Sequence, residues 1–365
     1  MAHAKAGESL PVPNVQALAQ TWNGSGEQVP DRYVRTEKTG AEEVVAGCAI
    51  PVVDLSRLLD PGRRKRSSQT SELPAATGVS FIQTVKDCVQ LINHGVPDEV
   101  IQDVKRDITE FFKLPLEAKK AHAQAPGGIQ GYGQAFVFSE AQKLDWADMI
   151  YLMISPREER DLRFWPARPP SFRDSVDGYS AETARVAACL LRFMAADLGV
   201  EPEHLTEAFR GQPQSMRATY YPPCRQAGDV LGLSPHTDAT GLRLLLHVND
   251  VQGLQIRRDD GRWLAVDPLE GAFVVSIGDI LELIKQPEIQ KIEHRAVVHP
   301  DKDRISAAMF HQPCPDTTVG PLLELVKKDG GRAPYKCGNF CGFDPLINLE
   351  IIINLKSSCE GVVQI

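Results

Sequence analysis

The sequence predicts an α+β fold in which a largely helical first half precedes an antiparallel β-sandwich or barrel. In the first 200 residues, apolar side chains recur at the spacing of amphipathic helices. After about residue 212, short β-rich runs alternate with Gly, Pro and Asp turns at roughly ten-residue intervals, as antiparallel strands do. These two sequence patterns mark the expected halves of the chain.

The helices of the first half are marked by periodicity and by their ends. Residues 97–114 carry an apolar stripe, with Pro97 suited to the first turn and Pro115 to the stop. Residues 181–198 form a second amphipathic helix that ends at a glycine, and a third is expected over Val15–Trp22. The stripe of the first helix consists of Val100, Ile101, Val104, Ile108, Phe111 and Phe112.

Strands are expected where short apolar or β-branched runs lie between turn residues. Two come early, over Ile50–Leu55 and over Val89–Ile92, which an Asn-His-Gly turn stops. The later runs are Met216–Tyr221, Gly241–Val248, Gly253–Arg257, Trp263–Val266, Ala272–Ile277, His294–Val298 and Arg304–Phe310.

Composition bounds the size and the partners of the protein. The 365 residues are 42% hydrophobic, enough for one large domain or two closely packed ones. The net charge of -8 is spread along the chain, and the basic run 63–66 is typical of a solvated loop, so no nucleic-acid partner is expected. Without a long apolar span or a signal core in residues 1–7, we expect no membrane segment and a cytoplasmic location. Eight irregularly spaced cysteines indicate reduced thiols.

The motif His236-Thr237-Asp238 carries the first chemical signal. Residues i and i+2 of a strand point to one face, so this imidazole and carboxylate can meet one metal ion. The third ligand is expected from another strand, and His294 stands at a plausible strand start. Two histidines and one carboxylate leave coordination positions open, as in non-haem Fe(II) oxygenases. A His-x-Asp pair also occurs by chance, and His294 alone could be a structural histidine.

A second signal lies ten residues further on, at Arg304-Ile305-Ser306. The same period of two places a guanidinium and a hydroxyl on one face, which suits strong, oriented binding of a carboxylate. Tyr221 could add another hydroxyl. A metal with open positions beside a carboxylate anchor indicates a 2-oxo acid cosubstrate. The alternative for Arg304 is an exposed charge at a strand end.

The order of these motifs resembles that of the plant 2-oxoglutarate/Fe(II)-dependent dioxygenases. The likeness covers roughly residues 48–335 and is to the branch that holds codeine O-demethylase, lateral-branching oxidoreductase and senescence-related oxygenases. Anthocyanidin synthase is a more distant relative. Further matching segments are Ile92–Val96, Gln130–Gly133, Leu144–Asp148, Tyr220–Cys224, Gly253–Gln255 and Ile277–Asp279.

The resemblance implies a double-stranded β-helix (jelly roll) core with a helical N-terminal region and flanking helices. The expected division is 1–47 for an N-terminal extension, 48–165 for an N-terminal dioxygenase region, 166–210 for linking helices, 211–315 for the Fe(II)/2-oxoglutarate jelly-roll domain and 316–365 for an atypical C-terminal tail.

The resemblance also implies the cofactors and the reaction. Fe(II), 2-oxoglutarate and O2 are expected, with ascorbate as reductant, and Tyr221, Arg304 and Ser306 are expected to hold 2-oxoglutarate. Thr219 is a weaker candidate, because the family usually has Asn there. A monomeric enzyme would hydroxylate, demethylate or desaturate a small plant metabolite or xenobiotic and release succinate and CO2. The sequence does not choose among these reactions or substrates.

Aromatic residues are the candidates for the substrate pocket. Phe310 shares the parity of Arg304, and the resemblance suggests that it stacks on a substrate ring. Tyr132, Phe136 and Phe138 are further candidate walls. Ordinary core packing is the alternative for each of them.

Several stretches depart from the family pattern. An aromatic anchor is missing in residues 75–88, the turn ahead of His294 is rewritten in 284–291, and an apolar tail fills much of 336–365. Arg243 stands where a small hydroxyl is common, and a guanidinium facing inward there would be costly.

Two alternatives to an active oxygenase remain open at this point. The altered segments allow a degraded, non-catalytic homologue that acts as a binding protein. A zinc hydrolase could use the same three ligands, although hydrolysis needs no carboxylate anchor at Arg304 and Ser306.

Overall fold

A computed structural model describes most of the chain between residues 10 and 322 and three short pieces beyond it. The described residues are 10, 12–25, 28–35, 44–45, 50–59, 88–134, 137, 139–211, 213–285, 292–314, 317–322, 332–333, 338–339 and 363–364. Most of the three altered segments, together with Phe136 and Phe138, lie outside these residues. The division of the chain into regions stays a prediction.

The expected helices are present. Helix α1 (Val15–Ser25) and helix α5 (Asp98–Lys113) match their predictions closely. Helix α7 (Phe172–Leu198) ends at Gly199 in the left-handed conformation, but it begins nine residues before the predicted start. Its first turns contain polar and small residues such as Ser175, Gly178 and Ser180, which interrupt the apolar periodicity that predicts a helix. The shorter helices are α2 (Leu55–Leu59), α6 (Leu116–Lys120), α8 (Pro202–Thr206) and α9 (Asp279–Lys285).

Two sheets form the jelly roll, which confirms the expected fold class. The larger sheet has the order β2-β3-β11-β8-β13-β6-β5-β4, and the smaller has the order β1-β10-β9-β12-β7. The larger sheet comprises β2 (Val52–Asp54), β3 (Val89–Ile92), β4 (Gly131–Gly133), β5 (Asp148–Ser155), β6 (Gln214–Tyr221), β8 (Leu242–His247), β11 (Phe273–Ile277) and β13 (Arg304–His311). The smaller comprises β1 (Val44–Val45), β7 (Leu233–His236), β9 (Leu254–Arg257), β10 (Trp263–Ala265) and β12 (His294–Ala296). Short pairs complete the strands: β14 (Thr318–Val319) with β16 (Gly338–Asn339), and β15 (Arg332–Ala333) with β17 (Val363–Gln364).

Strands β4 and β5 are absent from the sequence prediction. Residues 148–154 of β5 are all buried, since the strand is covered on both faces. Its apolar run therefore lacks the alternation that marks a half-exposed strand.

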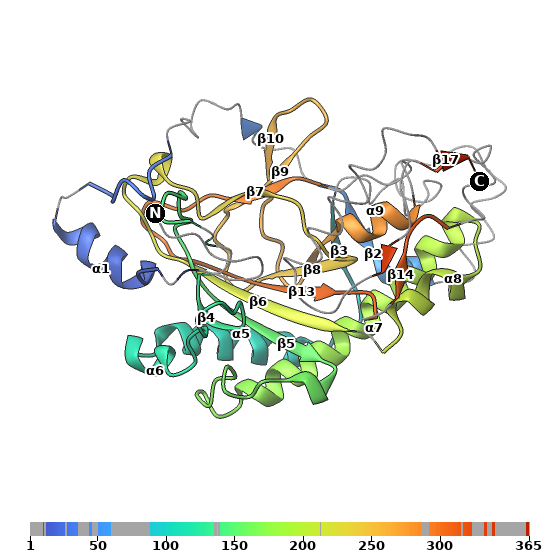
Figure 1. Cartoon of the computed structure of the whole chain (residues 1–365), viewed down its shortest axis with the longest axis horizontal. Coiled ribbons are helices and arrows are strands. Elements are labelled where there is room, and N and C mark those ends of the chain that lie inside the picture. The colour runs from blue at the N-terminus through green and yellow to red at the C-terminus, as the bar shows by residue number, and fades with distance from the viewer. Residues whose placement is uncertain are drawn as a thin grey trace.

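Helices cover one face of the larger sheet and leave the other face to the inside of the jelly roll. Figure 1 shows α5 and α6 on one side of β6 and β13, with β7, β9 and β10 on the other. On β8, Leu242, Leu244 and Leu246 belong to the core shared with α5 and α7. Because side chains alternate along a strand, Arg243 and His247 face the interior. The same parity turns alternate residues of β6 and β13 inward.

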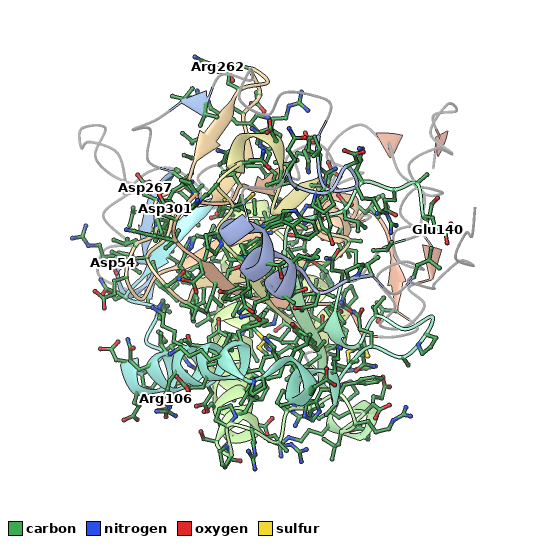
Figure 2. All side chains as sticks on the ribbon, turned by 90° about the vertical axis from the view of Figure 1, so that its left-hand side faces the viewer. Asp54, Arg106, Glu140, Arg262, Asp267 and Asp301 are labelled. Carbon is green, nitrogen blue, oxygen red and sulfur yellow. The ribbon has the colours of Figure 1, made fainter. Side chains whose placement is uncertain are left out.

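The outside of the protein carries charges of both signs. Figure 2 shows Arg106, Arg262, Glu140 and Asp301 around the periphery on different parts of the fold. No helix among the described residues is long and apolar enough to span a bilayer.

Candidate metal centre and cosubstrate pocket

Strand pairing in the smaller sheet brings the three expected metal ligands together. β7 and β12 are antiparallel, with His294 directly opposite His236. Asp238 lies just past the end of β7, and its two carboxylate oxygens lie 3.7 Å from His236 Nε2 and 3.6 Å from His294 Nε2. Ligand atoms from all three residues fall within 4.8 Å of one another.

The backbone beside Asp238 is held by a close approach at Gly278. The amide of Asp279 donates to the carbonyl of Asp238 at 2.8 Å. A Cβ on Gly278 would lie 2.1 Å from the carbonyl oxygen of Thr240, so no larger residue fits without displacing the loop. The Ile-Gly-Asp motif thus fixes the loop that carries the carboxylate.

Hydrogen bonds set the tautomers of both histidines. Nδ1 of His236 lies 2.8 Å from the carbonyl of Ser234, and Nδ1 of His294 lies 3.2 Å from the carbonyl of Ile292. A carbonyl only accepts, so each Nδ1 carries the proton and each Nε2 turns its lone pair toward Asp238.

The protonation states also suit a divalent metal. Burial lowers the pKa of His236 and, together with the nearby charge of Arg243, lowers that of His294 further. Burial opposes ionisation of Asp238, but the charge of Arg243, followed by smaller contributions from neighbouring groups, outweighs it and lowers the pKa of Asp238 to about 2. Neutral imidazoles and an ionised carboxylate are the forms that bind a metal.

Arg243 contacts two of the three ligands, as its inward position on β8 allows. Its Nη1 lies 3.1 Å from Asp238 Oδ2 and also donates to Nε2 of His294. The residue is only 3% exposed, and its Nε and Nη2 have no hydrogen-bond partner among the described residues. The guanidinium is therefore a buried cation held by the ligand cluster itself.

Arg304 lies inside the jelly roll, so the surface alternative for it is wrong. It is 2% exposed and stands across from Tyr221, whose ring centroid is 4.9 Å from its Cζ. Nε and Nη1 of Arg304 have no hydrogen-bond partner among the described residues. Burial lowers the pKa of Arg304, as expected for a cation without a counter-ion.

The neighbours of Arg304 form a buried polar cluster around it. Ser306 and Thr219 stand opposite each other on β13 and β6, both buried. A Cβ on Gly253 would lie 2.6 Å from Cδ of Arg304, and a Cβ on Gly232 would lie 2.6 Å from the ring of Tyr221. These two glycines thus leave room for the side chains of Arg304 and Tyr221.

His247 belongs to the same polar cluster and was not predicted. It stands opposite Ser306 on the other neighbouring strand and is 4% exposed. Neither ring nitrogen has a hydrogen-bond partner among the described residues. Burial, followed by the charge of Arg304, lowers the pKa of His247 to about 3. The parity that places Arg243 inside would also have identified this residue.

A cavity of about 410 Å³ opens beside the ligand cluster. His236, Asp238 and Phe310 line it, together with the unpredicted Arg217 and Gln312. Tyr132, in contrast, packs against Phe111 in the core and receives a hydrogen bond from Asn14, so its contacts fit the core-packing alternative.

Comparison with known proteins decides the family. Residues 50–168 match the family described as the non-haem dioxygenase in morphine synthesis N-terminal region, and residues 212–313 match the 2OG-Fe(II) oxygenase superfamily. The chain belongs to the 2-oxoglutarate- and Fe(II)-dependent oxygenases. Full-length similarity to enzymes of this family supports a catalytic protein over a degraded homologue or a zinc hydrolase.

Three relatives illustrate the similarity. 2-Oxoglutarate-dependent dioxygenase 11 of Oryza sativa subsp. japonica is 50% identical and covers 94% of both chains. S-norcoclaurine synthase 1 of Coptis japonica is 46% identical over 89% of both. A crystal structure of JOX2 in complex with 2OG, Fe and JA superposes with a TM-score of 0.78 at 29% identity, covering 95% of this chain and 94% of that one.

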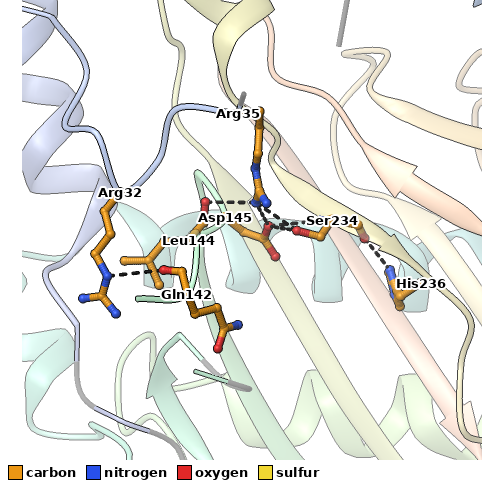
Figure 3. Close-up of polar contacts among 7 residues, drawn as sticks. All are labelled: Arg32, Arg35, Gln142, Leu144, Asp145, Ser234 and His236. Atoms are coloured by element: carbon orange, nitrogen blue, oxygen red, sulfur yellow. Dashed lines mark hydrogen bonds and ion pairs between the residues drawn. The ribbon is translucent and has the colours of Figure 1, made fainter. Parts of the chain in front are cut away.

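In this oxygenase, Arg35 and Asp145 hold Ser234 on strand β7, two residues before His236 (Figure 3). Asp145 accepts hydrogen bonds from the amide of Ser234 at 3.0 Å and from its hydroxyl at 2.5 Å. Arg35 binds Asp145 at 2.7 Å and also donates to Ser234 Oγ at 2.9 Å. Since the carbonyl of Ser234 orients His236, this chain of contacts runs from residue 35 to one of the expected metal ligands.

Proposed function

We propose that His236, Asp238 and His294 hold Fe(II) in this oxygenase and that Arg304, Ser306 and Tyr221 hold the distal carboxylate of 2-oxoglutarate. One observation supports the pairing above all: a ligand cluster and a buried guanidinium whose Nε and Nη1 have no hydrogen-bond partner among the described residues share the interior of one jelly roll. The donor set of two neutral imidazoles and a carboxylate fits Fe(II), and the buried guanidinium with unsatisfied Nε and Nη1 fits a carboxylate.

The residues divide the work between binding and orientation. The metal and the cosubstrate, once bound, supply the oxidising chemistry, and 2-oxoglutarate leaves as succinate and CO2. Arg304 binds the distal carboxylate in a dry setting, where a charge-assisted hydrogen bond is strong. Ser234 and Ile292 keep the Nε2 lone pairs of the histidines directed at the metal position. The side chains of Asp238 and His294 are buried, while His236 is partly exposed in the cavity wall, so the open face of the site is the one that a substrate can reach.

The cavity beside the cluster is proposed as the substrate site. Phe310 offers an aromatic wall for a substrate ring, while Arg217 and Gln312 provide polar contacts. A small plant metabolite or xenobiotic placed there would present a C–H bond to the metal face. Hydroxylation, demethylation and desaturation all begin from that placement.

The proposed function is tested by succinate release. Purified protein is incubated with Fe(II), ascorbate, O2 and 2-oxoglutarate, with and without a panel of plant metabolites. We expect slow succinate release without a substrate and faster release with the right one. No release at all from protein with metal bound at the site would contradict the proposal.

The finer expectations on assembly and location are also proposed. We propose a monomer, which light scattering coupled to size exclusion would test, and a cytoplasmic location, which a fluorescent fusion would test. A dimer mass or an organellar signal would contradict them.

A further inference from the structure

We infer that Arg243 is a built-in competitor of the metal, so that the guanidinium and Fe(II) are alternative cations for Asp238 and His294. The inference rests on the proposed metal site. It extends that site to a side chain on the facing sheet, which must leave its partners whenever the metal binds.

The competition follows from the atoms that Arg243 contacts. Its Nη1 lies 3.1 Å from Asp238 Oδ2 and donates to Nε2 of His294. The Nδ1 proton of His294 is committed to the carbonyl of Ile292, so Nε2 has the only lone pair that a metal can use. An N–H on that lone pair excludes a metal from it.

Electrostatics adds to the steric conflict. Asp238 is the carboxylate at the centre of this cluster. Besides Arg243 and His294, the guanidinium of Arg217 and the ring of His236 also interact with it. A divalent ion placed on Asp238 would therefore meet the charge of Arg243 at close range in a buried setting. Metal binding requires the guanidinium to turn away.

The neighbouring strands offer Arg243 a second position. Ser276 on β11 and Phe310 on β13 stand directly opposite it, so their side chains share its face. Oγ of Ser276 is buried and has no hydrogen-bond partner among the described residues. That hydroxyl can accept from the displaced guanidinium, and the face of the Phe310 ring can receive a cation. In this position Arg243 would lie beside the substrate cavity that Phe310 lines.

The probe is Mn(II), which binds such sites without being oxidised by O2. Its affinity is measured by titration calorimetry or electron paramagnetic resonance on the full chain and on the variants Arg243→Ser and Arg243→Gln. We expect both variants to bind Mn(II) at least tenfold more tightly than the natural chain. Arg243→Lys, which keeps a cation, should bind less tightly than these two.

A matched control separates contact from general charge. Arg217→Gln removes another inward-facing guanidinium, whose charge acts on His236 and Asp238 but which makes no ion pair or hydrogen bond with a ligand atom among the described residues. It should change Mn(II) affinity much less than Arg243→Gln. Melting supplies a second readout. Without metal, Arg243→Gln should melt below the natural chain because Asp238 loses its cation, and saturating Mn(II) should raise its melting temperature more.

The outcomes are distinguishable. Equal Mn(II) affinity in the natural chain and both neutral variants would overturn the competition while leaving the metal site intact. Absence of Mn(II) binding in all of them would overturn the proposed site, and with it the inference. If Arg217→Gln raised Mn(II) affinity as much as Arg243→Gln, the gain would come from removing positive charge in general and not from the contact of Arg243. That result would also overturn the competition.

Discussion

The two ends of the active site differ in how their charges are satisfied. At the metal end, Asp238 is already paired with Arg243, a cation of the same chain. At the cosubstrate end, Arg304 is buried with two N–H groups that have no partner among the described residues. A buried charge without a partner indicates an absent ligand, whereas a buried charge pair indicates that a ligand must compete for its place.

The largest expected effect comes from removing the carboxylate at the metal end. Asp238→Asn should abolish Mn(II) binding and reduce succinate release by more than about a hundredfold, beyond what loss of an outer contact costs. It also leaves Arg243 buried without its carboxylate, which should lower the free energy of unfolding by about 3 kcal/mol. Urea unfolding measures the second effect.

A double variant sharpens this test. In Asp238→Asn/Arg243→Gln the buried cation is gone as well, so part of the lost stability should return. If the double variant loses as much unfolding free energy as the two single variants added together, the two residues are not coupled.

The next largest effect belongs to the cosubstrate end. Arg304→Gln should raise the KM for 2-oxoglutarate about 10- to 100-fold, the value of a charge-assisted hydrogen bond. Mn(II) affinity should stay within about twofold of the natural chain. Arg262→Gln, at an exposed position, is the control. A large loss of Mn(II) affinity in Arg304→Gln would show that the two ends are not independent.

Acid should destabilise the metal-free protein through histidines that are buried neutral. The pKa of His247 and that of His311 are both lowered to about 3 by burial, with Arg304 contributing at His247. In the unfolded chain these residues titrate near pH 6.5. Between about pH 6.5 and 3 the unfolded state binds more protons, so stability falls as pH falls, by up to about 1.4 kcal/mol per pH unit for each histidine.

Denaturant unfolding at several pH values measures that slope. His247→Gln removes the contribution of the cosubstrate end, and His311→Gln removes one from elsewhere in the barrel. Each variant should flatten the slope. An unchanged slope in both would mean that the histidines are not held neutral.

The smallest expected effect comes from weakening the contacts of Arg35 and Asp145 with Ser234, which support the metal end. Asp145→Asn weakens the acceptor for Ser234, so His236 should be held less firmly, and Mn(II) affinity should fall by about tenfold or less. Calorimetry with Mn(II) checks this, with the exposed Glu140→Gln nearby as control. No change in affinity would make the contact purely structural.

The sequence predicted what depends on local pattern and missed what depends on distant partners. The strand period correctly turned Arg304 inward, and strand order set His294 opposite His236. Asp238, however, lies past the end of β7 and is placed by its loop rather than by the strand. The contact between Arg35 and Ser234 spans 199 positions and leaves no periodic trace. From the sequence, Arg243 was expected to be costly if it faced inward, and the structure shows that it does so and that it binds Asp238 and His294.

The short distance along the chain between Asp238 and Arg243 has a consequence for folding. These residues lie on either side of one turn, so their ion pair can form early, whereas His294 must arrive from a strand more than fifty residues away. The carboxylate can thus be buried already neutralised, before β12 pairs with β7 or an ion binds from solution. Arg243 would then neutralise the charge of Asp238 while the rest of the smaller sheet assembles.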